Sequence, residues 1–167
     1  GPAVLHLVDC SLLVPPRAGP DGRARYSMLE TLRVYGARLL AAVGKQDGAE
    51  AALARYAVRI AEKAAAGMTT IAGEPSSARW LDAEDATMAP VLAWAIEQDA
   101  DLALRLVDGL GRWWYLRARL AGQYRLLRQA AGRAVPGSDG WCAVQFFAGY
   151  AAHFSGDLAA SLGHFTA

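Results

Sequence analysis

Apolar positions recur with the period of an α-helix along most of the chain, most clearly after residue 100. Small and apolar side chains are spaced i, i+3, i+4 and i+7, which predicts one buried helix face. These positions are Val107, Leu110, Gly111 and Trp114. A second stripe on the opposite face is polar and is spaced i, i+3, i+7 and i+10. It consists of Arg105, Asp108, Arg112 and Tyr115.

Capping and breaking residues divide the helical pattern into separate helices. Ser27 and Glu30 have the spacing of a capping box, so we expect Ser27 to cap a helix that ends at Gly44. A proline inside a helix removes a hydrogen bond, so we expect Pro90 in the first turn of a further helix. We expect Asp99 to cap the helix that follows.

The N-terminal region carries the only strand signal in the sequence. Residues 3–10 read as the last turns of a helix. Two short segments with strand propensity, residues 12–16 and 23–28, flank the turn cluster RAGPDG at residues 17–22. This pattern predicts a β-hairpin with a rather long loop.

A repeat becomes visible when the chain is shifted by 38 residues. The shift places Gly111 on Gly149, and it places Ala118 on Gly156 at the expected tight turn between two helices. Each unit then reads as two helices with a small residue where they approach closely. We expect Gly149 to occupy such a close contact, so that Gly149→Leu destabilises the protein.

The composition favours an α-rich protein, because 54% of the residues are hydrophobic and many of these are alanine, the strongest helix former. Charge is distributed unevenly. Residues 74–108 carry eight acidic and two basic side chains, whereas residues 109–138 carry six basic and no acidic ones. Neighbouring helices that complement each other would explain this distribution. The arginines and aromatic residues interleaved in residues 112–133 would also suit a nucleic-acid surface.

Cysteine usage and hydropathy give expectations about location. Cys10 and Cys142 form no disulfide framework and have no CxxC partner. No apolar run approaches the roughly 18 residues that a membrane span needs. There is also no pattern of a signal peptide. We therefore expect a cytoplasmic protein with no membrane partner.

Catalytic and cofactor motifs are missing from the sequence. Gly44 and Lys45 do not form a P-loop, because Leu39 stands at the first glycine position and Gln46 at the Ser/Thr position. The histidines lack metal-ligand spacing, and no Ser/Cys/His grouping resembles a triad. They are His6, His153 and His164. We expect no enzymatic activity, no metal and no cofactor in this chain, and no ATP binding by the chain alone.

The order of segments resembles a known bacterial family. LVDCSLL precedes RYSMLETLRVYGARLL, and a long helical stretch then leads to WLDAEDATMAPVLAWAIEQ and GLGRWWYLRARLAGQYRLL. This order is similar to that of the AfsR- and LuxR-type transcriptional regulators, which are signal-transduction ATPases of the STAND class. The resemblance covers about residues 4–165. The glycine, small-residue and aromatic positions of the repeat resemble a degenerate tetratricopeptide repeat, although Ala118 and Arg119 replace the usual Gly-Asp at the first turn.

The resemblance implies a division into three parts. Residues 1–45 would be the C-terminal part of a winged helix with its β-hairpin, and residues 46–100 would be linker helices. Residues 101–167 would hold tetratricopeptide-like repeats, the second of them incomplete at the C-terminus. The expected fold class is mainly α, with a partial winged-helix hairpin followed by an antiparallel tetratricopeptide-like helical array.

The resemblance also implies a non-enzymatic function in transcription regulation and signal transduction. The chain would be the regulatory and sensor segment of a STAND-type regulator. Its partners would be the ATPase domain of the same parent protein and a small-molecule or peptide effector, and a homo-oligomer stays open. ATP would bind only in a missing upstream domain. One alternative is a protein–protein scaffold with no ligand. The other is a nucleic-acid-binding fragment that uses residues 112–133, which we favour least because Arg125 and Arg128 fall on the second helix of the unit.

In tetratricopeptide arrays the first helices of the repeats line the binding groove. We therefore predict an effector or partner site on their inner face. Its candidate residues are Arg105, Arg112, Tyr115, Phe146, Tyr150 and His153. The 38-residue shift carries Arg112 onto Tyr150 and Tyr115 onto His153, so the two units would present one surface. If these side chains instead pack against residues 74–100, the basic stretch is one half of an internal charge match.

Overall fold

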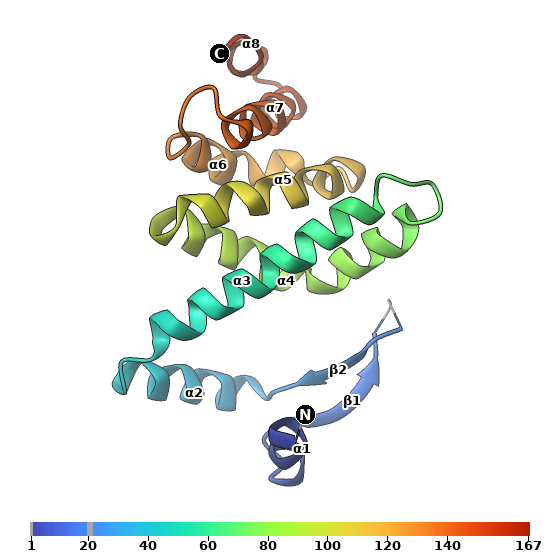
Figure 1. Cartoon of the computed structure of the whole chain (residues 1–167), viewed down its shortest axis with the longest axis vertical. Helices are drawn as coiled ribbons and strands as arrows, with labels where there is room; N and C mark the ends of the chain where they lie inside the picture. The colour runs from blue at the N-terminus through green and yellow to red at the C-terminus, as the bar shows by residue number, and fades with distance from the viewer. Residues whose placement is uncertain (1, 20–21) are drawn as a thin grey trace. The chain divides into compact units, whose positions relative to one another are not determined.

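A computed structural model describes residues 2–19 and 22–167, and within them the chain forms eight helices and one antiparallel hairpin. Their order is α1 (Pro2–Asp9), β1 (Val14–Ala18), β2 (Ala24–Ser27), α2 (Glu30–Ala42), α3 (Gln46–Gly67), α4 (Glu74–Gln98), α5 (Ala100–Leu116), α6 (Leu120–Ala131), α7 (Asp139–Phe154) and α8 (Leu158–Thr166) (Figure 1). The predicted class, mainly α with a hairpin followed by a helical array, is confirmed. In the described part of the chain, no helix is long and apolar enough to cross a membrane.

The chain divides into two compact units, residues 1–52 and residues 53–167. Unit 1 contains the predicted hairpin, in which Val14 pairs with Ser27 and Arg17 pairs with Arg25. The register shifts between Val14 and Arg17, because two prolines that lack an N–H group occupy this stretch of β1. Pro20 and Asp21 of the predicted turn lie outside the described residues.

The predicted capping box at the start of α2 is wrong. Ser27 is the last residue of β2, and its pairing with Val14 keeps it in the strand. Leu29 is the N-cap of α2, and no side chain caps this end. Glu30 binds the guanidinium of Arg33 one turn later instead. The other end is as predicted, because α2 stops before Gly44, whose positive φ of 65° suits a helix C-terminus.

The prediction for Pro90 is also wrong. Pro90 lies inside α4, and a different proline, Pro75, occupies the first turn. An interior proline costs about 3 kcal/mol in an isolated helix. Here Met88 and Leu92 on either side of it are almost completely buried. Burial of these side chains in the core of unit 2 offsets the lost hydrogen bond, so one long helix replaces the two that the sequence indicates.

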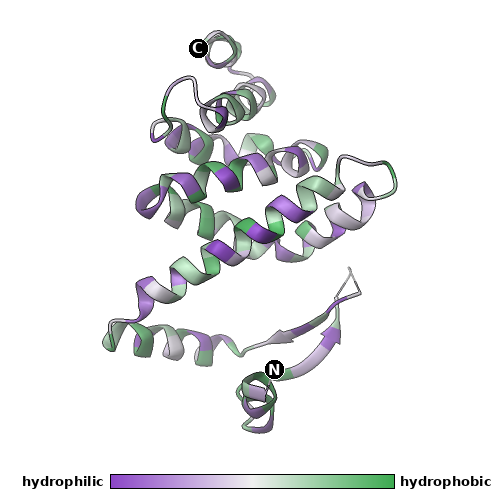
Figure 2. Ribbon diagram, viewed as in Figure 1, coloured by the Kyte–Doolittle hydropathy of each residue, from purple (hydrophilic) through white to green (hydrophobic). Residues whose placement is uncertain are grey.

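The core of unit 2 lies between successive helices of the array. α4 packs against α5, α5 contacts α6 and α7, and α7 packs against both α6 and α8. Trp113, Trp114 and Leu110 are fully or almost fully buried there. The whole apolar stripe predicted on α5 is buried, and the whole polar stripe is exposed. The helices of unit 2 accordingly carry both hydrophilic and hydrophobic residues (Figure 2).

The chain reversals at the ends of α5 and α7 share one hydrogen-bond pattern, and the two reversals lie 38 residues apart. At the end of α5 the N–H of Arg119 donates to the carbonyl of Trp114 at 2.8 Å. At the end of α7 the N–H of Asp157 donates to the carbonyl of Ala152 at 3.0 Å, and both of these residues are shifted by 38. The two helical hairpins, α5–α6 and α7–α8, therefore turn in the same way.

The residue at the apex of each reversal has a left-handed backbone. Ala118 has a φ of 53° and Gly156 has a φ of 82°. Glycine adopts this conformation without strain, whereas alanine does so only at a cost. The side chain of Asp157 also caps α8 by accepting from the N–H of Ala160, which Arg119 at the equivalent position cannot do. The first hairpin therefore lacks both local aids that the Gly-Asp pair supplies to the second.

Three glycines of α5 and α7 lie at close helix contacts, and the sequence did not single out one of them, Gly109. A Cβ atom added to Gly149 would lie 2.7 Å from the ring of Phe165, so the predicted close contact at Gly149 is confirmed. A Cβ on Gly111 would overlap the ring of Phe147. At Gly109 the close neighbour is backbone, since its Cβ would lie 2.9 Å from the carbonyl carbon of Ala61 on α3.

Candidate functional site

The first helices of the two hairpins, α5 and α7, form a groove. Its volume is about 410 Å³, and it is lined by Arg112, Tyr115, Leu116, Phe146, Phe147 and Tyr150. Four predicted site residues are therefore brought together, two from each helix. Tyr115 and Phe146 are about half exposed, so the walls of the groove can be reached from solvent.

Aromatic rings in mutual contact make up most of the walls. The ring centroids of Tyr115 and Tyr150 lie 5.5 Å apart with an edge-to-face arrangement. Those of Phe146 and Tyr150 lie 5.0 Å apart, also edge to face. Phe154 extends the cluster on α7, 6.0 Å from Tyr115. Such rings offer rigid apolar surface with little conformational entropy to lose on binding.

Arg112 supplies the one charged side chain among the residues that line the groove. Its Nη2 atom donates to Oε2 of Glu74, the first residue of α4, at 3.3 Å. The Arg112 side chain is 53% exposed and that of Glu74 is 39% exposed. This pair is therefore a partly solvated ion pair in which one N–H of the guanidinium is used.

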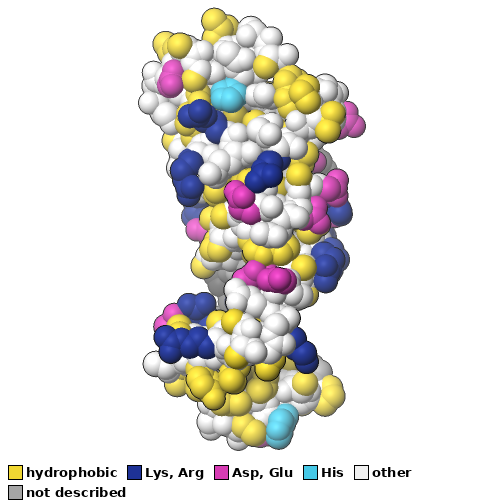
Figure 3. Space-filling model, turned by 90° about the vertical axis from the view of Figure 1, so that its left-hand side faces the viewer, with side chains coloured by type: hydrophobic (Ala, Val, Ile, Leu, Met, Phe, Trp, Pro, Cys, Tyr) yellow, Lys and Arg dark blue, Asp and Glu magenta, His cyan; other side chains and the backbone are white. Residues whose placement is uncertain are grey.

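The arginines of the basic stretch pair with the acidic residues of α4. Four of the six arginines in residues 112–133 make such pairs. They are Arg112 with Glu74, Arg117 with Asp82, Arg119 with Asp85, and Arg133 with Glu97. The predicted complementarity of the acidic and basic segments is confirmed. On the face drawn in Figure 3, basic and acidic side chains are interspersed over unit 2 and do not form one basic track.

Asp82 of α4 binds both a buried tryptophan of α5 and an arginine at the C-terminus of that helix. It accepts a hydrogen bond from Nε1 of Trp113 at 3.0 Å and another from Nε of Arg117 at 3.1 Å. Burial alone would raise the pKa of Asp82, but the hydrogen bonds from Arg117 and then Trp113 outweigh burial and hold the pKa below its usual value. Arg119 covers the Trp113 ring, and its buried Nη1 meets Asp85 at 2.8 Å without hydrogen-bond alignment.

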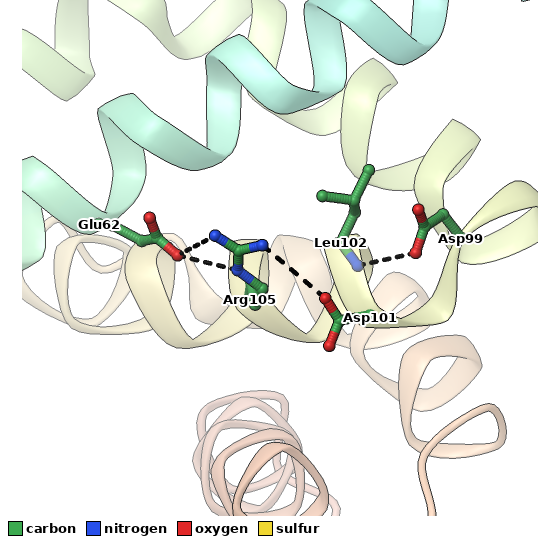
Figure 4. A network of polar contacts seen from close by, with 5 residues as sticks. All are labelled: Glu62, Asp99, Asp101, Leu102 and Arg105. Carbon is green, nitrogen blue, oxygen red and sulfur yellow. Dashed lines mark hydrogen bonds and ion pairs between the residues drawn. The ribbon is translucent and has the colours of Figure 1, made fainter.

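Arg105 does not belong to the groove. Its guanidinium makes two hydrogen bonds to Glu62 of α3, at 2.9 Å and 2.7 Å, and an ion pair with Asp101 (Figure 4). It lines a separate hollow with Asp108 and residues at the start of α7. Arg105 and Arg112 share a helix stripe, but seven residues of helix separate them by about 10 Å. The common stripe therefore does not bring them to one site.

His153 is also outside the groove lining. It is exposed in the last turn of α7, where its ring centroid lies 5.6 Å from that of Phe154. Tyr115, its counterpart in the first repeat, turns its ring toward Tyr150 instead. Equivalent positions in the repeat therefore have different surroundings: Tyr115 contacts Tyr150 of α7, whereas His153 contacts Phe154 of its own helix.

Two lining residues, Leu116 and Phe147, were not predicted as site residues. Phe147 fills the space that the missing side chain of Gly111 leaves free. The signal for it was the glycine at position 111, which the repeat alignment had already marked. Only the packing of α5 on α7 shows which of the two adjacent phenylalanines meets that glycine.

A second polar cluster lies between α6, α7 and α8. Nδ1 of His164 is 2.6 Å from Oε1 of Gln145, and Nε2 of His164 is 3.4 Å from the Tyr124 hydroxyl. Burial, followed by the nearby charge of Arg128, lowers the pKa of His164. Among residues 2–19 and 22–167, no group of three His, Cys, Asp or Glu side chains is placed to hold a metal ion.

Comparisons of the chain with family models, with curated protein sequences and with solved structures find no match.

Proposed function

We propose that this chain is the regulatory and sensor segment of a STAND-type bacterial transcriptional regulator of the AfsR/LuxR type, and that its groove binds an effector. The observation that carries the proposal is the origin of the groove walls. They come from the first helix of two successive helical hairpins that repeat with a period of 38 residues. In tetratricopeptide-like arrays this face receives ligands, and a β-hairpin before the array suits the C-terminal part of a winged helix.

The segment is non-enzymatic in this proposal. ATP is bound and hydrolysed in a separate domain of the same parent protein, and the chain acts in the cytoplasm. An effector shifts the regulator only if its binding free energy differs between the resting and the active form. Unit 1 offers apolar surface for the ATPase domain, because Tyr35 and Leu39 of α2 are 61% and 48% exposed.

Direct binding of nucleic acid is disfavoured by the arrangement of the arginines. Arg117, Arg119 and Arg133 are each within 3 Å of a carboxylate of α4. A phosphate backbone would have to displace these acidic side chains, which also repel it. We expect only weak oligonucleotide binding that falls steeply as salt is added.

The binding role of the groove can be tested with the neutral fluorescent probe N-phenyl-1-naphthylamine. We expect the full chain to bind the probe, and Phe146→Ser to weaken the binding by removing an aromatic wall. Leu162→Ser is the matched control, because Leu162 is exposed on α8 and does not line the groove. No probe binding, or equal binding by the wild type and Phe146→Ser, would rule out the groove as an effector site.

The family assignment can be tested separately in the natural gene. We expect the region upstream of this segment to encode a nucleotide-binding domain with a Walker motif. An upstream region without one would contradict the STAND assignment, whatever the groove binds.

A further inference from the structure

We propose that the groove takes a small apolar molecule that carries one anionic group, and that this anion replaces Glu74 on the guanidinium of Arg112. The inference depends on the proposed role of the groove as an effector site and specifies its ligand chemistry. It also gives ligand binding a structural consequence, because the Arg112–Glu74 pair links α5 to the first turn of α4.

The lining of the groove sets the chemistry of the ligand. Five of the six lining side chains are aromatic or aliphatic, and the sixth is Arg112. None of the described residues that line the groove carries a carboxylate, so a cationic ligand would meet the aromatic rings but also the positive charge of Arg112. An apolar anion matches both features, since its body contacts the rings and its charge meets the guanidinium. The volume of about 410 Å³ suits a small molecule better than a folded partner.

Arg112 is held less firmly by its carboxylate than Arg105 is. Its contact with Glu74 is a single hydrogen bond of 3.3 Å. By contrast, Arg105 makes two hydrogen bonds to Glu62, the longer of 2.9 Å. Partly exposed ion pairs contribute little to stability. An incoming anion can therefore take the place of Glu74 at small cost, and it can use two N–H groups of the guanidinium.

Replacement of Glu74 by the ligand breaks one ion pair between α4 and α5 and leaves the neighbouring ion pairs intact. Arg117 and Arg119 continue to hold Asp82 and Asp85 on the following turns of α4. The ligand would thus release the first turn of α4 and the loop before it, while the rest of the interface between α4 and α5 stays closed. Ligand binding and the Arg112–Glu74 pair are mutually exclusive in this scheme.

Two probes with one ring system separate charge from apolar contact. 1-Anilinonaphthalene-8-sulfonate carries an anion, and N-phenyl-1-naphthylamine is its neutral counterpart. We expect the full chain to bind the anionic probe more tightly than the neutral one. Arg112→Gln should weaken binding of the anionic probe about tenfold, the value of one charge-assisted contact, and should leave the neutral probe unchanged.

The decisive variant is Glu74→Gln, which removes the competing carboxylate and keeps the size of the side chain. We expect this variant to bind the anionic probe several-fold more tightly than the wild type does, and to bind the neutral probe with unchanged affinity. Arg125→Gln is the matched control for a general loss of positive charge, because Arg125 lies on α6 outside the groove. The Arg125→Gln variant should bind both probes with the affinity of the wild type.

The outcomes separate this inference from the proposed function. The inference is overturned if Arg112→Gln or Glu74→Gln leaves the affinity for the anionic probe unchanged. It is also overturned if Arg125→Gln weakens binding of the anionic probe as much as Arg112→Gln does. The groove itself stands in that case, provided that Phe146→Ser still weakens the neutral probe. If an acidic peptide with aromatic side chains binds in an Arg112-dependent way while the anionic probe does not, the proposed ligand class is wrong. Unchanged binding of both probes to Phe146→Ser overturns the groove and the inference together.

Discussion

The two units of this chain have regular secondary structure of the same kinds but differ in burial. In unit 1, none of the described residues 2–19 and 22–52 is buried. Its helix α2 carries hydrophobic positions along its length (Figure 2), yet Tyr35 and Leu39 on it are about half exposed or more. In unit 2, most helices contribute fully buried side chains, among them Trp113 and Leu110.

This difference shows which forces decide local structure in each unit. In unit 1 the hairpin and the end of α2 at the left-handed Gly44 follow local sequence signals, although strand pairing of Ser27 displaces the predicted cap of α2. In unit 2, tertiary packing overrides a local signal, since α4 continues through Pro90. The apolar side chains that unit 1 leaves open are consistent with a partner surface, as the proposed function requires.

We expect the largest difference in stability when one leucine from each unit is replaced by alanine. Leu110→Ala removes a fully buried side chain, and we expect the free energy of unfolding to fall by about 2–5 kcal/mol. Leu39→Ala removes a half-exposed one, and we expect a change of about 0.5 kcal/mol or less. Urea unfolding followed by far-UV circular dichroism measures both. Equal effects would show that unit 1 is buried in solution against something outside it.

A pair of glycines sharpens the comparison. Gly109→Ala places a Cβ 2.8 Å from Cβ of Ala61 and 3.2 Å from the backbone nitrogen of Glu62, so we expect a loss of about 1–3 kcal/mol. Nothing lies within 4 Å of the same atom on Gly36 in α2. Gly36→Ala should therefore raise stability by about 0.5–1 kcal/mol through helix propensity alone. A loss at Gly36, measured by the same urea titration, would mean that α2 has a close neighbour.

A smaller difference in stability is expected when an arginine-binding acidic residue of each unit is replaced by alanine. Asp82→Ala in unit 2 leaves the indole N–H of the buried Trp113 without its acceptor, which costs about 1–3 kcal/mol. Glu30→Ala in unit 1 breaks only an exposed pair with Arg33, and its unfolding midpoint should stay unchanged. The pKa of Asp82 is lowered in the folded state, so its contribution is complete above the unfolded pKa of about 3.9 and is lost as the pH falls through the folded value. Urea titrations at neutral and acidic pH should show a larger difference between the two variants at neutral pH.

The smallest effect concerns α8, where Ser161 is the one buried residue. The folded state lowers the pKa of His164, so the neutral imidazole is favoured and its contribution is complete above the unfolded pKa of about 6.5. We expect the unfolding midpoint to fall slightly as the pH is lowered below that value. His164→Gln, which cannot titrate, should lose this part of the pH dependence. A wild-type midpoint that rises in the same range would contradict the direction of the shift.

The sequence predicted the parts of the site that depend on one helix or on the repeat. The periodicity of α5 placed Trp114 in the core and Arg112 and Tyr115 on the open face, and the 38-residue shift added Tyr150 from α7. It did not show that Arg105 on the same stripe would turn to Glu62 instead. Spacing along one helix defines a face, but the contacts on that face depend on the neighbouring helices.

By itself the sequence determined the mainly α class, the hairpin, the apolar face of α5 and the turns at Ala118 and Gly156, because each depends on spacing or backbone conformation within a few residues. Only the tertiary structure decided that α4 continues through Pro90, that Gly109 meets α3, and which arginines pair with which carboxylates. The physical reason is range. Backbone hydrogen bonds within a helix or turn join near neighbours in the chain, whereas the side-chain contacts between α4 and α5 join residues more than 30 positions apart.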